Sequence, residues 1–134
     1  SLPYLPMVRR RRRLRQKKEA EVPRVAPART KANGPWPTSG VVTTFTAANV
    51  TDKQETPCTG RELIVARNSG ASSRTITIEG VPIYGRDGDI TAESIAAGAV
   101  KVFGPFNRKG FRQTDGMIYF EANNAEVLFA VIEF

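Results

Sequence analysis

The chain has 134 residues, of which 40% are hydrophobic, so its length and composition fit one folded domain. It contains 20 Lys and Arg against 13 Asp and Glu, one cysteine and no histidine. The absent histidine removes the commonest general base and metal ligand, and a single cysteine excludes an intramolecular disulfide.

The positive charge is concentrated in the first part of the chain. Residues 1–40 contain 11 basic and 2 acidic side chains, which gives +9, whereas residues 41–134 contain 9 basic and 11 acidic ones, which gives −2. Such asymmetry is typical of a flexible arm that binds a polyanion or an acidic protein surface. We therefore predict an extended, basic N-terminal arm over residues 1–40.

A block of arginines in residues 9–18 is the strongest candidate binding segment of this arm. Guanidinium groups about 3.5 Å apart along an extended chain suit phosphate oxygens or clustered carboxylates. Three interpretations stay open: a nucleic-acid contact, a contact with an acidic stripe on a partner protein, and a solvated tail. The partner-binding residues predicted in this block are Arg9, Arg10, Arg11, Arg12, Arg13, Arg15, Lys17 and Lys18.

Residues 19–40 form a linker punctuated by four prolines, and its backbone should be extended and largely polyproline-like. At about 3.1 Å per residue such a segment spans at most roughly 65–70 Å, which is enough to reach a neighbouring molecule. Trp36, between Pro35 and Pro37, is the predicted anchor of the linker, because prolines reduce the entropy lost on docking and the indole is a large apolar group. It either inserts into a neighbour or packs against its own domain.

From residue 41 onward the sequence predicts β-strands separated by Gly, Pro, Asn and Asp turns, and no helix of useful length. This pattern indicates an all-β fold, a single antiparallel β-sandwich or jelly-roll-like domain over residues 41–134. The predicted strands are residues 41–46, 62–67, 74–79, 90–95, 99–103, 117–121 and 126–132.

The last predicted strand is apolar on both faces. Val127 and Phe129 point to one side, and Leu128 and Ile132 point to the other. A small antiparallel domain normally covers only one face of each strand, so the arm, a loop or another subunit should cover the second face. We favour a contact with another subunit.

Catalysis is poorly supported by the sequence, and we expect a protein that is not an enzyme and uses no cofactor or metal. Cys58 has no histidine to activate it. Asp87 and Asp89 could begin a calcium loop, but the position that should supply a glutamate is Gly98. A tight Asp-Gly turn between strands is the better interpretation of this segment.

Four segments, together with the closing apolar strand, carry a resemblance to known proteins: ELIVARN at 62–68, YGRDGDI at 84–90, AGAV at 97–100 and FGPF at 103–106. Through them residues 59–134 resemble small virion proteins encoded among the head genes of tailed bacteriophages. The resemblance implies a capsid decoration (cement) protein or a head-completion component, whose β-domain and arm lie across neighbouring shell subunits.

The expected partners are therefore the major capsid protein or other virion subunits, in a symmetric homo-oligomer located in the virion, with no membrane contact. The first alternative is a nucleic-acid-binding virion or packaging protein that uses the arginine-rich arm on DNA. A carbohydrate-active jelly roll is a weaker third interpretation, because the chain lacks paired glutamates in a recognisable setting.

Overall fold

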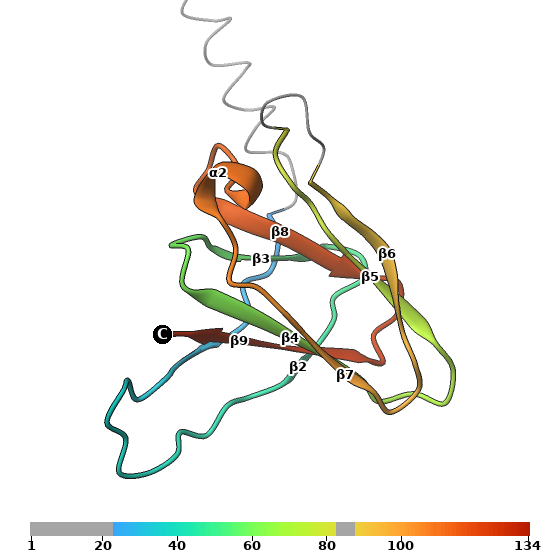
Figure 1. Cartoon of the computed structure of the whole chain (residues 1–134). Helices are drawn as coiled ribbons and strands as arrows, with labels where there is room; N and C mark the ends of the chain where they lie inside the picture. Colours follow the sequence, from blue (N-terminus) through green and yellow to red (C-terminus); the bar gives the residue numbers. More distant parts are fainter. Residues whose placement is uncertain (1–22, 83–87) are drawn as a thin grey trace, which may run out of the picture.

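The computed structural model of the protein describes residues 23–82 and 88–134. Their strands form two sheets that pack face to face around one hydrophobic core (Figure 1). The predicted all-β sandwich is thereby confirmed. No helix in the described ranges is long and apolar enough to cross a membrane.

The four strands of the first sheet are all antiparallel to their neighbours and are joined by backbone hydrogen bonds. Its side chains alternate clearly in the central strands: Ile76 and Ile78 are buried on one face, while Thr75 and Thr77 lie on the other. In spatial order the strands are β3 (Gln54–Pro57), β8 (Met117–Ala122), β5 (Arg74–Ile78) and β6 (Ile90–Ile95).

The second sheet is built around β9 (Val127–Glu133), which pairs antiparallel with β4 (Glu62–Asn68) along seven residues of each strand. The outer neighbour of β4 is β7 (Val100–Phe103). Two short strands share the opposite edge of β9: β1 (Arg29–Lys31) pairs parallel with its end, and β2 (Thr46–Ala47) pairs antiparallel with its middle.

The core lies between the inner faces of the two sheets. Phe120 on β8 and Phe129 on β9 meet edge to face with their ring centroids 4.9 Å apart, and both side chains are fully buried. Burying one such side chain contributes about 1.5–3 kcal/mol to the free energy of folding. Ile64, Ile76, Ile118 and Val131 fill the space around this aromatic pair.

Six of the predicted strands are present, and the seventh is much shorter than expected. Only Thr46 and Ala47 pair with β9, although residues 41–46 are rich in β-branched side chains. The reason is that β1 occupies the same edge of β9 at Val131–Glu133, so Thr43 and Thr44, which would lie opposite Ile132 and Val131 if β2 were extended, cannot pair there. Within residues 23–82 and 88–134 the structure also contains two strands that the sequence did not predict, β1 and β3, and one short helix, α2 (Arg108–Phe111).

Part of the predicted linker belongs to the sandwich. Val25 pairs with Gln54 at the edge of the first sheet, and β1 pairs with β9 in the second. Residues 25–31 therefore cross from one sheet to the other, with Pro27 buried between the two contacts. Regular pairing thus begins before residue 41, where we had placed the domain boundary. The extended backbone that prolines favour also suits a strand at a sheet edge.

Candidate partner-binding surface

Arg29 on β1 connects the linker to both sheets. Its guanidinium group donates hydrogen bonds to the Thr56 hydroxyl (3.3 Å) and the Pro57 carbonyl (2.8 Å) on β3. On the other sheet it pairs with Glu62 of β4 (3.2 Å) and Glu133 of β9 (2.7 Å). One side chain therefore fixes the position of β1 against three strands.

Glu62 is the buried partner of this arginine, and its side chain has no solvent exposure. Besides Arg29, its carboxylate accepts hydrogen bonds from the Thr59 amide (2.7 Å), the Gly60 amide (3.2 Å) and the Thr59 hydroxyl. Burial alone would raise the pKa of Glu62, but the bonds from Thr59 and the charge of Arg29 outweigh it and lower the pKa below its ordinary value. Glu62 is therefore ionised at neutral pH and orders the 59–60 turn.

Arg24 ties the beginning of the same segment to the first sheet. Its guanidinium carbon lies 4.3 Å from the centre of the Tyr119 ring, and the group pairs with Glu79 at 3.1 Å. It also donates to the Gln54 carbonyl at 3.1 Å. Tyr119 in turn donates to Asp115, and this hydrogen bond is the largest cause that raises the pKa of Tyr119 to about 12. The linker is thus anchored before and after Pro27.

A loop of residues 32–45 leaves this anchored segment and projects away from both sheets, at the lower left of Figure 1. Its neck is held by hydrogen bonds: the Ala32 amide donates to the Glu133 carbonyl (2.7 Å), and the Thr30 hydroxyl donates to the Thr43 hydroxyl (2.9 Å). The Asn33 side chain closes the loop on the Ser39 carbonyl (2.5 Å). The loop therefore has a fixed base and a defined internal turn.

Trp36 lies in this loop and is 92% exposed. Of its two sequence interpretations, packing against its own domain is not seen with any described residue. Val42, in the same loop, is 89% exposed. An exposed indole between two prolines on an anchored loop is a preorganised apolar group, and such groups are often energetic hot spots of protein interfaces.

The outer face of the second sheet is also apolar. Val65 and Ala130 are buried but do not belong to the central core, because they point to the opposite side of the sheet. Next to Val65 on β7, Val102 is 60% exposed. By contrast, the first sheet presents polar side chains such as Thr77 and Glu121 on its outer face. The last strand is therefore apolar on both faces, as expected, but Val65 is 8% and Ala130 0% exposed, so the chain itself already covers the middle of the outer face.

Basic side chains gather at the end of the sandwich from which the loop leaves. Lys31 and Glu62 both pair in register with Glu133, and the Phe134 amide donates to the Arg61 carbonyl. We call this end the basic end, and we define it by five exposed residues, none of which forms an ion pair within the described ranges: Lys31, Arg61, Arg108, Lys109 and Arg112.

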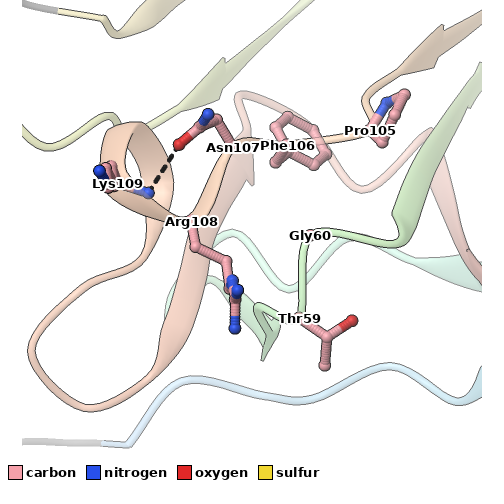
Figure 2. A pocket seen from close by; sticks show the side chains of 7 residues that line it. All are labelled: Thr59, Gly60, Pro105, Phe106, Asn107, Arg108 and Lys109. Atoms are coloured by element: carbon pink, nitrogen blue, oxygen red, sulfur yellow. Dashed lines mark hydrogen bonds between the residues drawn. The ribbon is translucent and has the colours of Figure 1, made fainter.

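A pocket of about 590 Å³ opens at the basic end, between the 59–60 turn and residues 105–109. Figure 2 shows Arg108 directed from α2 toward Thr59 and Gly60, while Lys109 lies on the other side of the helical turn. The Asn107 side-chain oxygen accepts a hydrogen bond from the Lys109 amide (2.8 Å) and caps the start of α2. Gly104 comes directly before the pocket residues 105–109. Its φ is +111°, and a Cβ at this position would lie 2.6 Å from the Glu62 carbonyl oxygen, so only glycine fits here.

The structure places one of the predicted site residues and leaves the others outside its described ranges. Trp36 is on the exposed loop, whereas the basic block of residues 9–18 lies in the part that is not described. Sequence reasoning missed the structural role of Arg24 and Arg29, which it counted with the basic arm. It also missed the basic end, because those residues are far apart in the sequence.

No protein-family model, curated protein or solved structure matches this chain. The resemblance to phage head proteins therefore stays a prediction.

Proposed function

We propose that this protein is a virion structural protein, a decoration protein that stabilises a bacteriophage capsid by bridging shell subunits through its arm and its β-domain. The observation that carries the proposal is the loop of residues 32–45, which is anchored at its neck and presents Trp36 to solvent. A side chain of this size and exposure is suited to insertion into a partner protein.

The free energy that burial of the indole could contribute supports a docking role for Trp36. An indole buries on the order of 200 Å², and at about 25 cal/mol per Å² this gives roughly 5 kcal/mol before ordering costs. The neck hydrogen bonds already restrict the loop, so less conformational entropy is lost on binding. A net contribution of about 2–4 kcal/mol is therefore reasonable for Trp36.

The charge distribution supports a second contact through the arm. Residues 1–22 contain 8 basic and 2 acidic side chains, whereas residues 23–134 contain 12 basic and 11 acidic ones. Arg24 and Arg29 pair with carboxylates of the fold, so most of the net positive charge of the sequence belongs to the segment before Pro23. Several weak contacts on one shell raise each other's effective concentration, so none has to be tight alone.

Cosedimentation with DNA-free expanded shells of the same virion tests the proposal. Trp36→Ala should weaken binding roughly 30- to 700-fold, which corresponds to about 2–4 kcal/mol, and replacing Arg9 to Arg13 with serine should weaken it further at low salt. Val50→Ala, at another exposed apolar site, is the control and should bind like wild type. Failure of the wild type to bind shells, together with salt-sensitive binding of duplex DNA, would favour the nucleic-acid alternative instead.

A further inference from the structure

We propose that the pocket at the basic end seats an acidic side chain of the partner protein, with Arg108 as its main contact. Because it assumes a protein partner, the inference rests on the proposed function. The pocket has a volume of about 590 Å³, which is ample for a carboxylate side chain, and Arg108 points into it beside Thr59 and Gly60. A guanidinium group can bind a carboxylate through two parallel hydrogen bonds.

The charge around the pocket lacks a counter-charge from the described part of the chain. Arg108 lines the pocket, and Arg112 caps the same helical turn, because its amide donates to the Arg108 carbonyl (3.1 Å). The nearby carboxylates Glu62 and Glu133 are both paired with Arg29 already. The described charged residues of the pocket lining, Arg108 and Lys109, are both basic, so the pocket should attract an anion.

The wall of the pocket is fixed before any ligand arrives. The Thr59 and Gly60 amides both donate to the buried carboxylate of Glu62, and Arg29 holds that carboxylate from the other side. On the opposite wall the Phe106 ring is 4% exposed and packs edge to face on Phe111, with ring centroids 5.1 Å apart. A ligand therefore meets a preorganised site and does not have to order it.

The observations favour a protein carboxylate over a nucleic-acid phosphate. Phe106 is buried, so the pocket offers no exposed aromatic face on which a base could stack. Among the described side chains, Arg108 is the one cation directed into the pocket, which suits a single carboxylate better than a phosphate backbone that needs several cations along its path. The apolar loop with Trp36 leaves the same end, so a partner that fits both needs an apolar cavity beside an acidic group.

Two-dimensional NMR of the full chain, titrated with a short peptide of consecutive glutamates, tests the inference at the level of single residues. The amide signals of Gly60 and Lys109 and the side-chain signal of Arg108 should shift together and saturate. The double substitution Arg108→Gln/Arg112→Gln should weaken this binding roughly tenfold or more. Arg67→Gln is the matched control, since Arg67 is exposed on β4 and makes no ion pair with any described residue.

Three results would overturn the inference: peptide-induced shifts confined to residues 1–22, equal peptide affinity in the double variant and wild type, or a response of the pocket signals to duplex DNA but not to the peptide. The result of the shell-binding experiment is independent of the result of the peptide titration. If shells bind through Trp36 and the peptide leaves the pocket signals unchanged, only the inference is wrong. If the peptide occupies the pocket and wild type does not bind shells, the proposed function is wrong.

Discussion

Replacing Arg29 with alanine should destabilise the domain by about 3 kcal/mol. Removing one partner of a buried ion pair typically costs about 3–5 kcal/mol, because the other charge stays buried. Glu62 has no solvent exposure, but it keeps its hydrogen bonds from Thr59 and Gly60, and Arg29 itself is 18% exposed. We therefore expect a value near the lower limit, which lowers the Tm of a domain of this size by roughly 10–20 °C.

Equilibrium unfolding in urea, followed by circular dichroism, measures this loss directly. Lys31→Ala is the matched control on the same strand, because Lys31 is exposed, and its effect should stay within about 0.5 kcal/mol. Replacing both partners, Arg29→Met with Glu62→Gln, should recover much of the loss, since no buried charge is then left unpaired and the glutamine oxygen can still accept the Thr59 and Gly60 amides. A single Arg29→Ala variant as stable as wild type would refute the idea that this pair fixes the linker to the sandwich.

Three further predictions concern the fold. Deleting residues 1–22 should leave the midpoint of thermal unfolding nearly unchanged, whereas deleting residues 1–40 removes β1 and should lower it at least as much as Arg29→Ala; equal midpoints for the two deletions would contradict the structure. The pKa of Tyr119 is raised to about 12 from 10, so the stability that Tyr119 contributes is present below pH 10 and is lost as the pH rises toward 12. The difference between the ultraviolet titrations of wild type and Tyr119→Phe should show a tyrosine that ionises near pH 12 and not near pH 10. The pKa of Glu62 is lowered from 4.5, so the stability that Glu62 contributes is present above pH 4.5 and is lost on further acidification. Glu62→Gln should flatten the dependence of the unfolding free energy on acidic pH, and an unchanged dependence would argue against this role of Glu62.

The strands that could be predicted from the sequence are those whose core face is apolar. The alternation around Ile76 and Ile78 and the apolar run of β9 are direct consequences of burial on a sheet. β3 escaped prediction because its two buried side chains are Gln54 and Thr56. β1 escaped for a related reason: its inward residue is Arg29, whose charge is matched by Glu62 only in the folded chain.

The candidate site was predictable only where one short segment carries it. Pro35, Trp36 and Pro37 are adjacent in the sequence, so an exposed anchor could be proposed from them alone. The basic end could not, because Lys31, Arg61 and Arg108 come together only when β1, β4 and the segment after β7 meet at one end of the sandwich. The net charge of residues 41–134 did not reveal the basic end either, because acidic residues elsewhere in the domain balance its positive charge.

The central claim is that the anchored loop inserts Trp36 into a partner protein on the virion. Trp36 is the one tryptophan of the chain, so the intrinsic tryptophan fluorescence of the protein reports on this side chain alone. On titration with DNA-free expanded shells, prepared from capsid protein whose own tryptophans are replaced, we expect the emission to move to shorter wavelength and become shielded from a soluble quencher. Binding that leaves the emission wavelength and the quenching of Trp36 unchanged would contradict the claim.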